Sequence, residues 1–117
     1  MALQDDGKQV MLEELGTAAV RCDLYDGDGS LLTGEDYNGP QTVSWTFNGT
    51  TKVLELDDSD GICAEFEVPA GTVKYIGFRN SGLTATYIKH DLGSDAETFT
   101  NPGIYQVTAG SVELDPA

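Results

Sequence analysis

The fold of this chain is decided by residues 64–80, which read Ala64-Glu65-Phe66-Glu67-Val68-Pro69-Ala70-Gly71-Thr72-Val73-Lys74-Tyr75-Ile76-Gly77-Phe78-Arg79-Asn80. Apolar and acidic residues alternate as far as Val68, a pattern typical of a strand with one buried face and one solvated face. Pro69 and Gly71 suit a tight turn, because proline presets φ and glycine accepts positive φ. Strand-like runs flank this turn, so we expect the stretch to form the central hairpin of a β domain.

Alternating patterns and turn signals predict further strands on both sides of this hairpin. With those already described they make about eight short strands, which favours an antiparallel β-sandwich or a jelly-roll-like domain. Asn48-Gly49 predicts a hairpin between strands 41–48 and 52–56, and Ala109-Gly110 predicts a last hairpin. The remaining predicted strands cover residues 18–25, 83–90, 104–108 and 111–114.

The phase of the first predicted strand assigns its side chains to two faces. Val20, Cys22 and Leu24 alternate with Arg21 and Asp23, so we expect the apolar set to point inward and the charged set outward. The second cysteine, at position 63, is in phase with acidic residues. We therefore expect one buried thiol and one exposed thiol, and no disulfide.

We expect one β domain over residues 1–117, with an N-terminal segment 1–17 and a β-sandwich over 18–117. A short helix is predicted from Asp5 to Leu15, with Asp5 or Asp6 as its cap and an end at Gly16. Its apolar stripe, formed by Val10, Met11 and Leu15, must pack either on the chain's own sheet or on a neighbouring subunit. We favour packing on its own sheet.

Charge excludes several classes of partner. Twenty acidic residues against six basic ones give a formal net charge of −14, which repels phosphate and disfavours nucleic acid and anionic membranes. No apolar run approaches the ~18 residues of a membrane span, and residues 1–6 lack the pattern of a signal peptide. We expect a soluble protein that is made in the cytoplasm.

The sequence offers little for catalysis or for a cofactor. His90 is the only histidine and lies beside charged residues at a predicted strand end, and no nucleotide-binding loop is present, so we expect no enzyme and no cofactor. Two acidic stretches, 26–35 and 58–67, share part of the calcium-loop spacing, but Leu24 and Leu56 occupy the first ligand position. We interpret both as acidic turns, with a loose divalent site as the alternative.

The loop over residues 26–40 is the first candidate interaction surface. It is long and rich in Gly, Asp and Asn, and loops of this length in compact domains often carry contacts. Leu31 and Leu32 either plug the end of the sandwich or contact a partner, and both readings stay open.

Three motifs carry a resemblance to a known family: Phe66-Glu67-Val68-Pro69-Ala70-Gly71-Thr72-Val73, Ile76-Gly77-Phe78 and residues 99–110, Phe-Thr-Asn-Pro-Gly-Ile-Tyr-Gln-Val-Thr-Ala-Gly. Together with the N-terminal helix and the strand Gln41-Thr42-Val43-Ser44-Trp45, they resemble a family of small proteins encoded among the structural genes of tailed phages. The resemblance runs through most of the chain. Members of that family are described as tail-fibre-like or as virion decoration proteins.

The resemblance implies a capsid decoration or minor capsid protein on the virion surface, which binds the lattice of the major capsid protein. It would act as a homo-oligomer, with a trimer at local threefold positions as the candidate form. The alternative is a tail, neck or fibre component, with a carbohydrate-binding role if Tyr37, Tyr75 or Tyr87 forms an aromatic platform. The candidate capsid contacts are apolar groups on the N-terminal segment and the long loop: Leu3, Val10, Met11, Leu31, Leu32 and Tyr37.

Overall fold

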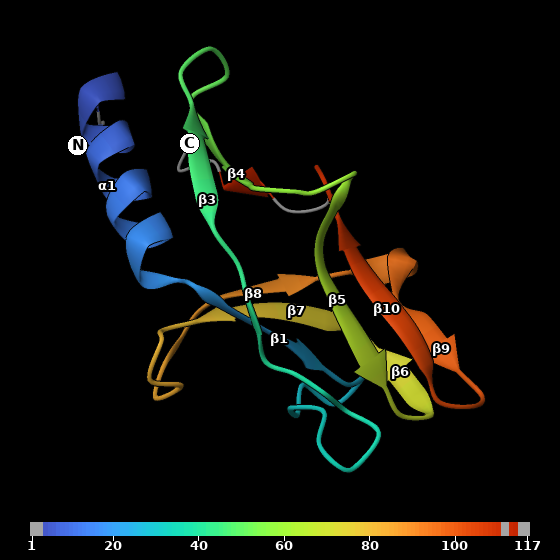
Figure 1. The fold of residues 1–117 in the computed structure, drawn as a ribbon. Helices are drawn as coiled ribbons and strands as arrows, with labels where there is room; N and C mark the ends of the chain where they lie inside the picture. The colour runs from blue at the N-terminus through green and yellow to red at the C-terminus, as the bar shows by residue number, and fades with distance from the viewer. Residues whose placement is uncertain (1–3, 111–112, 115–117) are drawn as a thin grey trace.

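The computed structural model describes residues 4–110 and 113–114, and this part of the chain is an antiparallel β fold with an α-helix at its N-terminal end (Figure 1). In chain order the elements are α1 (Asp5–Ala18), β1 (Arg21–Tyr25), β2 (Gln41–Thr42), β3 (Trp45–Asn48), β4 (Val53–Leu56), β5 (Ile62–Val68), β6 (Gly71–Val73), β7 (Tyr75–Arg79), β8 (Thr86–Asp91), the 3₁₀ turn η1 (Gly93–Asp95), β9 (Glu97–Phe99), β10 (Gly103–Thr108) and β11 (Glu113–Leu114). None of the described helices is long and apolar enough to cross a bilayer.

The core lies between two layers. One layer is the sheet β2-β1-β7-β8, and the other is the antiparallel pair β5-β10. Both layers contribute side chains to one cluster of buried residues, which confirms the all-β prediction. Fully buried members include Leu24, Ile76 and Phe78 from the first layer and Phe66 and Val68 from the second.

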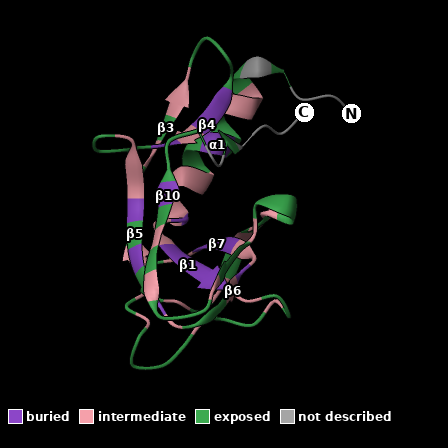
Figure 2. Cartoon of the chain, turned by 90° about the vertical axis from the view of Figure 1, so that its right-hand side faces the viewer, coloured by how far each residue is buried: buried purple, intermediate pink, exposed green. Residues whose placement is uncertain are grey.

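A smaller sheet extends the molecule at the end where the N-terminal helix lies. Its strand order is β11-β4-β3, and α1 packs against β3 and β4 (Figures 1 and 2). The pair β6-β9 completes the sheets at the opposite end. These additions make the molecule elongated, with principal extents of 47 × 29 × 24 Å.

The predicted central hairpin is wrong in its pairing, although its alternation is confirmed. Phe66 and Val68 are buried while Glu65 and Glu67 are exposed, but β5 pairs with β10, and β6 pairs with β9. Pro69 and Ala70 connect β5 to β6, which begins at Gly71 with a φ of +134°. The turn is therefore a corner between two separate sheets, because it redirects the chain out of the plane of β5.

Two other strand predictions need the same kind of correction. The predicted strand 41–48 divides at Val43 and Ser44, because β2 pairs with β1 whereas β3 pairs with β4. The hairpin at Asn48-Gly49 exists, and residues 49–52 connect its strands. The last predicted hairpin is wrong, because β11 pairs with β4 and β10 pairs with β5.

Helix α1 extends further than predicted and presents a different face. Its N-cap is Gln4, which makes no side-chain capping bond, and the helix continues through Gly16 to Ala18. A Cβ atom at Gly16 would lie 3.1 Å from Cβ of Trp45, so this glycine allows the helix to approach the sheet closely. Leu12 is the buried contact, at 4% exposure. Helix α1 therefore packs on its own sheet, as predicted. Of the predicted stripe, Leu15 packs against the core, whereas Val10 and Met11 do not.

The outward orientation predicted for Asp23 is also wrong. In β1 the residues Cys22 to Tyr25 are all buried, because both faces of this strand are covered. Burial raises the pKa of the Cys22 thiol. Cys63 is partly covered rather than exposed, and both cysteines are free thiols.

Candidate functional site: an apolar surface on α1 and β8

The structure separates the two sets of predicted contact residues. Val10 and Met11 are 62% and 52% exposed on α1, whereas the loop 26–40 lies at the other end of the molecule (Figure 1). In that loop Leu31 is exposed at 37%, but Leu32 and Tyr37 pack against the core. Leu3 lies outside the described residues.

An apolar surface joins the exposed side of α1 to the beginning of strand β8. We call this the α1–β8 surface, and it consists of Val10, Met11, Leu15, Ala18 and Tyr87. Two shallow hollows run along it, and they share Glu14 and Ala18. Tyr87 is 49% exposed. Exposed large apolar side chains that gather in one place are typical of interaction sites, whereas singly scattered ones are ordinary.

A β-bulge brings Tyr87 to this surface. Phe78 is opposite Ile88 and Arg79 is opposite Thr86, so Tyr87 is the extra residue on β8. Bulges reorient a side chain and interrupt the pairing of a strand. The alternation of residues 83–90 predicted a regular strand, and no signal in the sequence marked the bulge.

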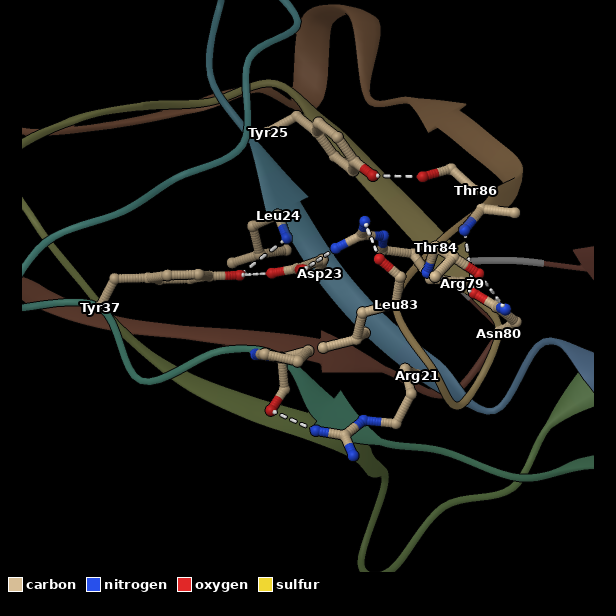
Figure 3. A network of polar contacts seen from close by, with 12 residues as sticks. Arg21, Asp23, Leu24, Tyr25, Tyr37, Arg79, Asn80, Leu83, Thr84 and Thr86 are labelled. Atoms are coloured by element: carbon tan, nitrogen blue, oxygen red, sulfur yellow. Dashed lines mark hydrogen bonds and ion pairs between the residues drawn. The ribbon is translucent and has the colours of Figure 1, made fainter.

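A buried polar cluster lies where β7 ends, beside the turn that leads to β8 (Figure 3). Asp23 is 3% exposed and receives a hydrogen bond from the hydroxyl of Tyr37 on one carboxylate oxygen. The Arg79 guanidinium binds the other oxygen, with Nη1 at 3.2 Å from Oδ2. The Tyr37 hydroxyl also accepts the Leu24 N–H at 2.9 Å. A buried charge thus has the partners that burial requires.

The same cluster fixes the turn that leads into β8. Arg79 donates from Nη2 to the carbonyl oxygen of Leu83 at 2.9 Å, and Asn80 accepts the N–H groups of Thr84 and Ala85 on Oδ1, each at 2.9 Å. These bonds hold residues 80–85 in one conformation just before the bulge (Figure 3). The position of Tyr87 is therefore set by interactions that begin at a buried carboxylate.

Tyr37 is held inside the structure. Its ring stacks on Phe66 with centroids 6.1 Å apart, and burial together with the hydrogen bond to Asp23 raises the pKa of its phenol. Tyr37 therefore fastens the loop 26–40 to the core. Tyr75 is partly buried under the cation of Lys89, 5.0 Å from the ring centroid. Of the three tyrosines considered for a carbohydrate platform, Tyr87 alone keeps about half of its surface exposed.

Each of the two acidic stretches begins with a turn in which one carboxylate binds the backbone, and the second stretch continues into β5 at Ile62. Asp26 accepts the N–H groups of Asp28 and Ser30, at 2.9 and 3.0 Å, and Asp58 accepts the N–H of Gly61 at 2.9 Å. Asp26 and Asp58 therefore lie in turns, as predicted. Within residues 4–110 and 113–114, no group of three or more His, Cys, Asp or Glu side chains is placed to hold a metal ion.

His90 lies in β8 opposite Ile76 of β7 and is partly buried.

Comparison with known proteins finds no matching family model and no significant match among curated proteins or solved structures.

Proposed function

We propose that this protein is a virion structural protein of a tailed phage that binds the major capsid protein through its α1–β8 surface. The observation that carries the proposal is the apolar surface itself, because Val10, Met11 and Tyr87 are exposed together on α1 and β8. The motifs in residues 66–78 and 99–110, which resemble phage structural proteins, support the same reading.

Charge supports the choice of partner. The surface carries Glu14 between its two hollows, and the chain has a net charge of −14, so the complementary site would be an apolar patch bordered by basic residues. On a capsid lattice the protein would act as a homo-oligomer, with a trimer as the form that suits a local threefold position. A tail, neck or fibre position would use the same surface in fewer copies.

The first test is the copy number of the chain per purified virion, measured by mass spectrometry against the major capsid protein. Hundreds of copies support decoration of the shell, and a few dozen or fewer assign the chain to the tail or neck. Absence from virions would overturn the proposal.

The second test uses substitutions on the surface. Met11→Glu and Tyr87→Ser should leave the fold intact and prevent binding to capsids that lack the protein. Ile104→Ser is the matched control, because Ile104 is 51% exposed on β10, away from the α1–β8 surface. Equal binding by all three variants would show that another surface is used, and Leu31→Asp would then test the loop.

A further inference from the structure

Strand β3 is an edge strand whose outer side has no partner strand within the described residues. Its sheet has the order β11-β4-β3, so β4 lies on one side only. Asp57 donates its N–H to the carbonyl oxygen of Ser44 at 2.9 Å, next to the pair formed by Trp45 and Leu56. Hydrogen-bonded and non-bonded pairs alternate in an antiparallel ladder. The peptide N–H and C=O groups of Trp45 and Phe47 therefore point away from β4.

This edge is short, but it lacks the charges, prolines and bulges that often prevent strand addition. The four residues Trp45-Thr46-Phe47-Asn48 include no charged side chain and no proline, and their pairing with β4 shows no bulge. The edge strand β8 differs, because it carries Lys89, Asp91 and the bulge at Tyr87. Charges, prolines and bulges are the usual protection of an edge, and an edge without them is a template for another strand.

The two faces beside this edge have different chemistry. On the face toward α1, a groove runs between β3 and the helix. Its sheet side presents the apolar groups of Trp45, Phe47 and Leu54, and its other lining residues include Gln9, Glu13, Thr17, Ser44 and Thr46. On the other face, Thr46 lines a hollow together with Glu55, Asp57 and Asp58. A strand added to β3 would thus meet the apolar groups of Trp45 and Phe47 with one set of alternate side chains, and the carboxylates of β4 and the following turn with the other.

We propose that the outer edge of β3 binds an extended peptide segment of another protein, in which apolar and basic side chains alternate. The segment pairs antiparallel with Trp45 and Phe47 through main-chain hydrogen bonds. Its apolar side chains enter the groove beside α1, and its basic side chains lie near Asp57 and Glu55. A second copy of β3 is disfavoured, because two copies would bring the same carboxylates together on chains of net charge −14. This inference does not depend on the α1–β8 surface.

A designed peptide tests the inference directly. The probe is a capped synthetic peptide of alternating lysine and valine, added to the ¹⁵N-labelled full chain. We expect saturable shifts and slower hydrogen exchange at the Trp45 and Phe47 amides, and a change in Trp45 fluorescence. A peptide of alternating glutamate and valine is the charge control, and it should not bind.

Two N-methylated peptides separate strand pairing from simple adhesion. In the proposed register each valine lies directly opposite Trp45 or Phe47, with its side chain on the same face of the sheet. The valine N–H and C=O groups therefore form the main-chain hydrogen bonds with β3, whereas the lysine N–H groups point to solvent. N-methylation of valine should weaken binding about tenfold or more, and N-methylation of lysine should leave it unchanged.

Three outcomes would overturn the inference. Equal binding of the two N-methylated peptides excludes main-chain pairing. Unchanged exchange at the Trp45 and Phe47 amides in the presence of the lysine–valine peptide shows that the edge is not the site. Protection of those amides in the protein alone, with a dimer in sedimentation, assigns the edge to a second copy.

Discussion

Arg79 on β7 binds Asp23 on β1 across the sheet, with its Nη1 at 3.2 Å from Oδ2 of a carboxylate that is almost fully buried. The same guanidinium holds the carbonyl of Leu83 in the turn before β8. One arginine therefore joins the interior of the sheet to the segment that positions Tyr87.

We expect Arg79→Met to lower the free energy of unfolding by about 3–5 kcal/mol, because it leaves the buried carboxylate of Asp23 without its cation. Urea denaturation measures the change. Lys74→Met is the matched control, since the ion pair of Lys74 with Asp91 lies at the surface and should add nothing measurable. Similar losses in the two variants would contradict the role of burial.

Tyr37→Phe keeps the ring on Phe66 but removes the hydroxyl that bonds Asp23 and the Leu24 N–H. We expect a loss of about 1–3 kcal/mol in the free energy of unfolding, because buried polar groups are left unpaired. Tyr87→Phe should change it by less than about 0.5 kcal/mol, as is usual at exposed positions. Amide exchange in residues 26–40 should also become faster in Tyr37→Phe, since the loop loses its attachment.

The orientation of α1 can be tested with two neighbouring residues. Leu12→Ala should lower the free energy of unfolding by about 2–5 kcal/mol, because Leu12 is buried against the sheet. Met11→Ala should stay within about 0.5 kcal/mol, because Met11 is half exposed and alanine favours helix. The reverse order of the two effects would mean that the helix presents its other face to the sheet.

Alkaline pH should destabilise the protein. The pKa of Tyr105 is raised to about 12, mainly because the phenol is buried and to a smaller extent because Glu97 is negatively charged. The folded state keeps this phenol neutral at a pH where the unfolded chain ionises it, so its contribution to stability is full below about pH 10 and is lost as the pH rises toward 12. In urea denaturation across this range, Tyr105→Phe should lose less stability than the wild type. Parallel losses would contradict the assignment.

Local patterns predicted the faces of several strands and the short-range pairing of β3 with β4 at Asn48-Gly49, but not the partners of β5, β6, β10 and β11. The alternation in residues 64–68 gave the correct buried set, because that pattern depends only on the pleat of one strand. The pairing of β5 with β10, in contrast, joins residues about forty positions apart, such as Tyr105 and Phe66. Turn signals at Pro69 and Gly110 marked where the chain bends, and they do not determine which strand lies alongside after the bend.

The sequence by itself determined that this chain is an acidic β protein with one short N-terminal helix, because charge, alternation and turn residues are local properties. The tertiary structure decided that Asp23 is buried, that Leu12 rather than Met11 meets the sheet, and that Tyr87 joins α1 in an exposed apolar surface. The first two features depend on contacts with distant parts of the chain. Tyr37 and Arg79 bind the carboxylate of Asp23, and β3 and β4 pack against α1. A local sequence pattern does not specify which distant residues will make these contacts.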